Sequence, residues 1–392
     1  MEQHLVDKIL AISKRVFPKV KEIREYLHAH PELSWAEKNT SLYIQNILTE
    51  NKIEFLPNIA THGIVAIIKG NIQSDRCIAL RADMDALPIQ ESSDVAYKSC
   101  TAGVMHACGH DVHMSCLLGA MFVINELKDQ LQGSVKFIFQ PSEEKQPSGA
   151  EAMINEGVLQ NPKVDFIVGM HVTPELETGK IGYRVGQFMA SADEIYLTVK
   201  GKGGHAAQAH KLIDPILIAS HIIVALQQIV SRNANAATPT VLSFGDIHGY
   251  GATNIIPDEV KIQGTMRTFN ELWRKEAHQK IKDICKGVAQ SMGGDCIVDI
   301  PNGLPFVEND KVITENIIAK ARSIFTTEQL VEMPIRMGSE DFGFYSQKIP
   351  ASFLRLGTKK ANEPITQLHT SVFDIDADAL LYGIQIFCAV AL

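Results

Sequence analysis

The sequence predicts an α/β fold with a mixed, mostly parallel sheet that is flanked by helices and interrupted by an inserted α+β domain. Three observations predict it. Short apolar segments typical of buried strands alternate with amphipathic helical segments over residues 1–187. Residues 188–300 follow the order strand, helix, two strands, helix and strand, which is the split βαβ arrangement of ferredoxin-like domains. Alternation of helix and strand returns over 301–392, so we expect 1–187 and 301–392 to form one discontinuous domain.

Helical spacing is clearest near the N-terminus, where Leu5, Ile9, Ile12, Val16 and Val20 fall on one face. Apolar runs and turn residues define the other elements of this domain. The predicted elements are helices at 5–27 and about 36–50, strands at 63–69 and 77–82, a helix at about 113–131, and strands at 134–139 and 164–170.

In the inserted domain the clearest helix start is Asp214-Pro215, because aspartate caps a helix and proline suits its first turn. This helix is expected to run to about residue 231. The other predicted elements of the insertion are strands at 195–199, 240–244, 259–267 and 296–300 and a helix at 271–291. An apolar helix is predicted from about residue 376.

The composition of the 392 residues, 45% hydrophobic and 21% charged, is that of a globular protein. A net charge of −8 argues against nucleic acid or an anionic membrane as a partner, because both select a basic face. We expect no membrane span, since no continuous apolar run reaches roughly 18–20 residues, and no signal peptide. Seven scattered cysteines do not suggest a disulfide framework, so a cytoplasmic location is predicted.

The segment MHACGHDVH at 105–113 carries the strongest chemical signal. It places Cys108 and His110 two residues apart, with Gly109 between them. A thiolate and an imidazole at this spacing can bind one divalent metal ion together.

Further candidate ligands follow predicted strands, where sites gather in open α/β sheets. Each also has a simpler interpretation, as an aspartate-rich turn, a solvated glutamate pair or a hydrogen-bonded structural histidine. These candidates are Asp83 and Asp85, the adjacent pair Glu143 and Glu144, and His171, to which His369 is added from a loop before the last predicted helix. With the Cys108 segment included, five of these residues are soft or borderline ligands: Cys108, His110, Glu144, His171 and His369. Five ligands exceed the needs of one tetrahedral ion and leave room for two ions.

The inserted domain has a polar set of its own. His205 lies in a glycine-rich turn and could donate to a developing oxyanion. The segment GATNIIP at 251–257 offers Asn254, and Arg267 could pair with a carboxylate. A surface histidine and an ordinary surface arginine are the alternative interpretation of these residues.

The motifs occur in an order that resembles a known family. They are HAHPELSWAE (28–37), RADMDALPI (81–89), MHACGHDVH (105–113), FQPSEE (139–144), GMH (169–171), GKGGHAA (201–207), NIIP (254–257), GTMRTF (264–269), MGSEDF (337–342) and LHTSVFD (368–374). Together they resemble the dinuclear metallopeptidases of the aminoacylase and carboxypeptidase G family, in particular its amidohydrolase branch with hippurate hydrolase, auxin-conjugate hydrolases and N-acetyl-diaminopimelate deacetylase. The resemblance covers nearly the whole chain.

The resemblance implies a role for each matching residue. Cys108, His110, Glu144, His171 and His369 would bind two divalent metal ions per subunit, with Zn, Mn, Co and Ni all suited to this ligand set. Glu143 would be the general base, with Asp83 and Asp85 beside the ligands and Asp85 as the orienting residue. The insertion would be a lid and dimerisation domain, from which His205 reaches the partner subunit's active site while Asn254 and Arg267 hold the substrate carboxylate.

The predicted reaction is hydrolysis of an N-acyl amino acid, of the hippurate or N-acetyl type, to a carboxylate and a free amino acid. Four alternatives stay open at this stage. A dipeptidase or carboxypeptidase would cleave the same bond type with the same metals, and a deacetylase of N-acetyl-diaminopimelate would differ only in its substrate. A non-catalytic metal-binding protein would not need Glu143, and a redox sensor would use Cys108 as a reactive thiol.

Overall fold

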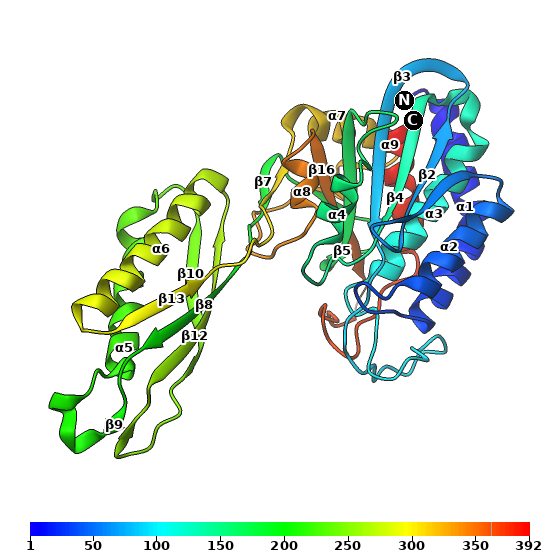
Figure 1. Ribbon diagram of the computed structural model, residues 1–392. Helices are drawn as coiled ribbons and strands as arrows, with labels where there is room; N and C mark the ends of the chain where they lie inside the picture. The colour runs from blue at the N-terminus through cyan, green and yellow to red at the C-terminus, as the bar shows by residue number, and fades with distance from the viewer. Residues whose placement is uncertain (362) are drawn as a thin grey trace. The chain divides into compact units, whose positions relative to one another are not determined.

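The computed structural model describes residues 1–361 and 363–392, which form two compact units (Figure 1). The first unit comprises Met1–Phe188, Glu308–Pro334 and Phe344–Leu392. The second comprises Met189–Val307 and Ile335–Gly343, so a short segment near residue 340 packs with the insertion.

An eight-stranded sheet forms the centre of the first unit, in the order β1-β2-β4-β3-β5-β16-β6-β15. Its central neighbours β4, β3, β5 and β16 are parallel, whereas β1, β2 and β6 add antiparallel pairs. This arrangement confirms the predicted mixed, largely parallel sheet. The strands are β1 Glu54–Ile59, β2 Gly63–Lys69, β3 Ile72–Asp83, β4 Gln132–Gln140, β5 Phe166–Glu177, β6 Ile181–Tyr183, β15 Leu330–Glu332 and β16 Ala351–Lys359, with the short pair β7 Gly186–Met189 and β14 Val307–Asn309.

Helices cover this sheet because their apolar residues bury against it and against one another. Helices α1, α3 and α9 pack together, and α3 is buried on nearly every side because it lies between its neighbours and strands β3 and β5. The helices are α1 Gln3–Ala29, α2 Lys38–Glu50, α3 His110–Glu126, α4 Gly149–Asn155, α7 Lys311–Ala321, α8 Gly343–Ser346 and α9 Ala379–Ala391.

The second unit has the predicted ferredoxin-like order, with a four-stranded antiparallel sheet β10-β12-β8-β13 and two helices, α5 and α6, packed against each other. Asp214 caps α5 by accepting from the amides of Ile216 and Leu217, as its sequence predicts. The elements are β8 Asp193–Lys200, β9 Gly204–His205, α5 Pro215–Leu226, β10 Thr240–His248, β11 Ile255–Ile256, β12 Glu259–Thr268, α6 Glu271–Ser291 and β13 Asp295–Asp299.

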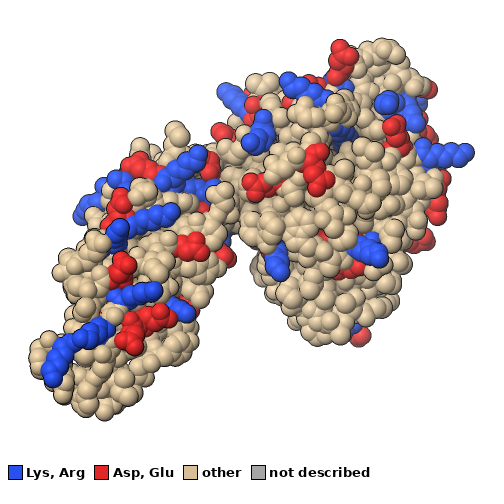
Figure 2. All heavy atoms as spheres, viewed as in Figure 1, with Lys and Arg blue, Asp and Glu red and all other residues tan. Residues whose placement is uncertain are grey.

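One helical stretch, Pro215–Asn233, is long and apolar enough to cross a membrane by length and composition, which the sequence analysis did not anticipate. A third of it is buried within the unit, where Ile218, Ile222 and Leu226 join the core of the ferredoxin-like sheet. On the face shown in Figure 2, acidic and basic side chains are interspersed over both units, without one large patch of either sign.

Two element boundaries differ from the prediction in ways that matter for the site. Helix α3 begins at His110 and ends at Glu126, whereas we predicted 113–131. Gly109 adopts a left-handed φ of 83°, so the chain turns directly into the helix. Strand β5 continues to Glu177 because it keeps its pairing with β16, so His171 lies within a strand and not after one.

Candidate metal centre

The predicted ligands converge in the first unit. Among the sets of three residues whose ligand atoms lie within 4.8 Å of one another, three contain at least two of the predicted ligands. They are Cys108, His110 and His171; Cys108, Glu144 and His369; and His110, Glu143 and Glu144. The sets share Cys108, His110 and Glu144, which is the arrangement that two neighbouring ions with common ligands require.

Cys108 lies where two imidazoles meet. Its Sγ is 3.3 Å from Nε2 of His171 and 3.2 Å from Nε2 of His369. His171 donates from Nδ1 to the carbonyl of Val172 at 2.8 Å, which leaves Nε2 with its lone pair facing the sulfur. His369 has a left-handed φ of 60°, and its amide donates to the carbonyl of Ala107 at 2.9 Å. The backbone thus fixes His369 next to the Cys108 segment.

The loop after β4 presents Glu143 and Glu144, and Asp85 holds it. The amide of Glu143 donates to Oδ1 of Asp85 at 3.0 Å, and the amide of Glu144 donates to Oδ2 at 2.9 Å. Ser34 also donates to Oδ2, at 2.6 Å. Asp85 therefore orients both glutamates through their backbone, and it lies 3.3 Å from Nδ1 of His110.

Asp83 connects the ligands to the sheet. It ends β3 beside Gln140, and Arg81 donates to its Oδ2 at 2.7 Å. His113 donates from Nδ1 to Oδ1 of Asp83 at 2.6 Å and accepts the amide of Val172 at 2.9 Å. Burial opposes ionisation of Asp83, yet His110, His113 and Arg81 hold its pKa well below its usual range.

Unpartnered buried atoms show that this donor set fits divalent cations. Nε2 of His110 and Oε1 of Glu144 lie 3.9 Å apart, and both are buried without a hydrogen-bond partner. A buried polar atom without a partner is costly, so these atoms need a ligand. Burial alone would lower the pKa of His110, but the carboxylates of Asp83 and Asp85 raise it to about 10. The surroundings of His110 therefore favour positive charge at the position where ions would bind.

The pKa of Cys108 bears on the redox alternative. Burial raises the pKa of this thiol well above its usual range, and the nearby carboxylates of Glu144 and Glu143 raise it further. A reactive sensor cysteine has a low pKa and an accessible sulfur. Cys108 is only 6% exposed, so the geometry suits a metal ligand better than a sensor.

The second unit carries the other three predicted residues, but it does not bring them all together. His205 pairs with Ile255 across the β9–β11 ladder, and the amide of Ala206 donates to the carbonyl of Asn254 at 3.0 Å. Arg267 lies near the other end of β12, where it donates to Oγ of Ser339 at 2.9 Å. The β8–β12 register separates these two ends of the sheet by about 23 Å at 3.3 Å per residue. Within one chain, Asn254 and Arg267 therefore lie toward opposite ends of this sheet, and their role in holding the substrate carboxylate stays a prediction.

Sequence reasoning missed several residues that support the site. His113 was noticed only as part of a motif, although Asp83 and Val172 both contact it. Glu37 accepts the amide of Ser142 at 2.7 Å, directly before the glutamate pair. Arg24 lies buried between Asp111 and Asp374. The helical spacing of α1 gave a partial signal, because Arg24 and His28 interrupt its apolar face.

Comparison with known proteins agrees with this geometry. Residues 79–392 match the model of peptidase family M20/M25/M40. The chain is 38% identical to an N-acetyl-L-cysteine deacetylase of Bacillus subtilis, covering 92% of this chain and 84% of that protein. It is 36% identical to thermostable carboxypeptidase 2 of Saccharolobus solfataricus, covering 97% and 96%. The crystal structure of a dinuclear metal-binding peptidase of the M20 family from Bacillus subtilis superposes with a TM-score of 0.83 at 35% identity, covering 96% and 98%. This chain therefore belongs to peptidase family M20/M25/M40 and is a hydrolase of amide bonds.

Proposed function

We propose that this protein hydrolyses N-acyl amino acids to a carboxylate and a free amino acid, using two divalent ions held by Cys108, His110, Glu144, His171 and His369. The observation that carries the proposal is the glutamate pair. Asp85 fixes the backbone of both glutamates, which both lie near His110, and Glu144 also lies near Cys108 and His369.

In this proposal the chain's own groups move the protons. Bound divalent ions would polarise the amide carbonyl and lower the pKa of water from 15.7 to about 7. Glu143 takes the proton of the attacking water and delivers it to the leaving nitrogen, because an amide nitrogen leaves only when it is protonated. Asp85 keeps Glu143 in place for both transfers through its backbone amide.

His205 is proposed to stabilise the oxyanion. Its Nδ1 accepts the amide of Ala207 at 3.2 Å, so the neutral ring carries its proton on Nε2. That N–H is a suitable donor to an oxygen that gains negative charge in the transition state.

We further propose that the protein works as a homodimer. His205 and Asn254 lie at one end of the second unit's sheet and Arg267 at the other. One small substrate can meet both ends only when they come from two copies of the chain. Exposed apolar side chains on α5, Leu217 and Val224, support an interface on this unit. The cytoplasmic location also stays a proposal, supported by seven free cysteines among the described residues.

The experiment must distinguish N-acyl amino acids from peptides as substrates, because the relatives are named both as a deacetylase and as a carboxypeptidase. Hydrolysis should therefore be screened with hippurate, N-acetyl amino acids, N-acetyl-diaminopimelate and dipeptides. The screen is run on protein as purified, after chelation, and after adding back Zn²⁺, Mn²⁺, Co²⁺ or Ni²⁺. Faster cleavage of dipeptides than of N-acyl amino acids would favour the peptidase alternative. If none of these substrates is hydrolysed with any of the metals, the proposed hydrolysis of N-acyl amino acids is rejected.

The base is tested with Glu143→Gln. We expect it to bind metal normally and to lose activity by about 10²–10⁴-fold, the usual contribution of a general base. Glu156→Gln, on an exposed glutamate after α4, is the matched control. Near-normal turnover of Glu143→Gln would reject the role of Glu143.

A further inference from the structure

A buried arginine joins two segments that carry proposed ligands. Arg24 of α1 is 2% exposed. Its Nε donates to Oδ2 of Asp111 at 2.9 Å, and its Nη2 donates to Oδ1 of Asp374 at 3.0 Å. One rigid guanidinium therefore binds two carboxylates that are far apart in the sequence.

Both carboxylates are close in sequence to proposed ligands. Asp111 directly follows His110 in the first turn of α3. Asp374 lies five residues after His369, in a stretch without regular secondary structure. Besides the hydrogen bond from the amide of His369 to the carbonyl of Ala107, the position of His369 therefore depends on what else anchors this stretch.

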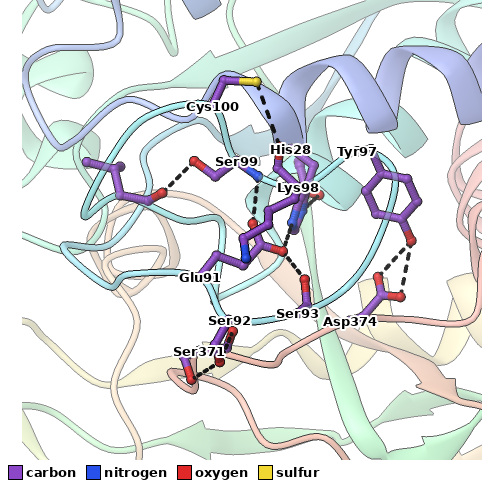
Figure 3. Close-up of polar contacts among 12 residues, drawn as sticks. His28, Glu91, Ser92, Ser93, Tyr97, Lys98, Ser99, Cys100, Ser371 and Asp374 are labelled. Atoms are coloured by element: carbon purple, nitrogen blue, oxygen red, sulfur yellow. Dashed lines mark hydrogen bonds and ion pairs between the residues drawn. The ribbon is translucent and has the colours of Figure 1, made fainter.

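Polar contacts of Asp374 and Ser371 with Tyr97 and Ser92 supply those anchors (Figure 3). Tyr97 donates to both oxygens of Asp374 at 3.2 and 3.1 Å, and its ring also faces the guanidinium of Arg24. The loop bearing Tyr97 also binds the His369 stretch at Ser371, through the amide of Ser92 at 2.8 Å and its hydroxyl at 2.7 Å.

His28 connects the same loop to α3. Its Nδ1 lies 2.8 Å from Oδ2 of Asp111, and its Nε2 lies 3.3 Å from Oε1 of Glu91. Glu91 in turn accepts the amide of Ser99 at 2.7 Å. Asp111 thus holds Arg24 and His28 together, and through them it is linked to both loops shown in Figure 3.

We propose that Arg24 is a positioning residue of the metal centre, which holds the His110 segment and the His369 segment in register by binding Asp111 and Asp374. This inference rests on the proposed function, because it presumes that the two histidines bind ions. It adds a residue that contacts no ligand and lies on a helix outside all the ligand-bearing segments. Partners that orient ligands typically change metal affinity by about 10–100-fold when they are removed.

The geometry makes the role specific to arginine. The two carboxylates bind different nitrogens of one planar group, Nε and Nη2. A lysine keeps the charge but has a single nitrogen, so it cannot reproduce this fork. Arg24→Lys should therefore displace either the His110 segment or the His369 segment, even though its positive charge still balances the buried carboxylates.

The test compares Arg24→Lys and Arg24→Met with Arg274→Met. Arg274 of α6 is a matched control in the second unit: it is also buried, 7% exposed, and binds Asp193 through two nitrogens at 2.8 and 2.6 Å. Chelated protein is titrated with Mn²⁺ in a calorimeter, and folding is checked by circular dichroism and thermal unfolding.

We expect the wild type to bind two ions, and Arg24→Lys to bind at least one of them about 10–100-fold more weakly. Arg274→Met should lower the melting temperature and leave both Mn²⁺ affinities unchanged. Folded Arg24→Lys with wild-type affinities at both sites would overturn the positioning role alone. A wild type that binds no divalent ion would instead reject the metal centre itself. If Arg24→Met does not fold, the comparison rests on the lysine variant.

Discussion

Glu37 offers a quantitative test of how the glutamate loop is held. This carboxyl is fully buried, and its Oε1 accepts the amide of Ser142 at 2.7 Å. Its Oε2 is buried without a hydrogen-bond partner. Burial raises the pKa of Glu37, and the nearby Asp85 raises it further, from 4.5 to about 7. Glu37→Gln removes the titrating group but keeps an oxygen to accept from Ser142.

The direction of the pH dependence follows from where the proton is released. The unfolded chain loses the Glu37 proton near pH 4.5, whereas the folded protein keeps it up to about pH 7. The folded state therefore binds more protons between these values, and the free energy of unfolding falls as the pH rises through them. At 1.36 kcal/mol for each pKa unit, the full loss for this group is about 3 kcal/mol.

The assay is urea unfolding of chelated protein at several pH values between 4.5 and 8. The difference in unfolding free energy between Glu37→Gln and the wild type should shift in favour of the variant by about 3 kcal/mol as the pH rises through this range. Glu50→Gln, on an exposed glutamate at the end of α2, is the matched control. A difference that stays constant with pH would show that Glu37 is ionised in the folded protein and would refute the reasoning.

Two further predictions concern the turn into α3 and recognition of the substrate. Gly109→Ala should destabilise the protein for two reasons. Its left-handed backbone costs about 1–2 kcal/mol for a residue with a side chain. Crowding costs about 1–3 kcal/mol more, since a Cβ would lie 2.6 Å from Cγ2 of Val172. Gly103→Ala, with φ 74° and open space around it, should show only the backbone loss in urea unfolding, and equal losses would reject the crowding argument. Arg267→Ala should raise KM for carboxylate-bearing substrates by roughly 10–100-fold. The control is Arg232→Ala, and an unchanged preference for such substrates over their amides would exclude Arg267 as the anchor.

The fold was largely predictable because its elements follow local patterns. The ferredoxin-like order of the insertion and the strand at 63–69 are encoded in alternation, capping and turns. The helix at 113–131 was misplaced because glycine spacing alone does not reveal a left-handed turn at Gly109. Strand β1 was missed since its exposed, proline-containing sequence gives no apolar alternation. The packing of Ile335–Gly343 with the insertion depends on tertiary contacts and has no local signal.

The candidate site was predictable where chemistry alone identifies the residue type. Cysteine, histidine and paired glutamates near the ends of apolar strands indicate metal ligands even before the tertiary structure is known. Arg24 and Glu37 could not be found this way. Each acts through a backbone or a carboxylate that lies more than 80 residues away in the sequence. Only the fold shows that Arg24 binds Asp374 and that Glu37 accepts the amide of Ser142, directly before the glutamate pair.

The charges around the centre explain why its ligands need cations while its supports do not. Asp111 has Arg24 and His28 beside it, and Asp83 has Arg81 and His113, so each supporting carboxylate is balanced by cationic or polar donors. The ligand set has no such balance of its own. There the carboxylates of Asp83 and Asp85 raise the pKa of His110, and Glu144 raises the pKa of His369, so that histidines supply the positive charge at that point. Divalent ions bound by the same atoms would take over that charge and release His110 to act as a neutral ligand. Buried supports that already carry their counter-charges can keep the ligands in place before the ions arrive, which is the property that preorganises a metal site.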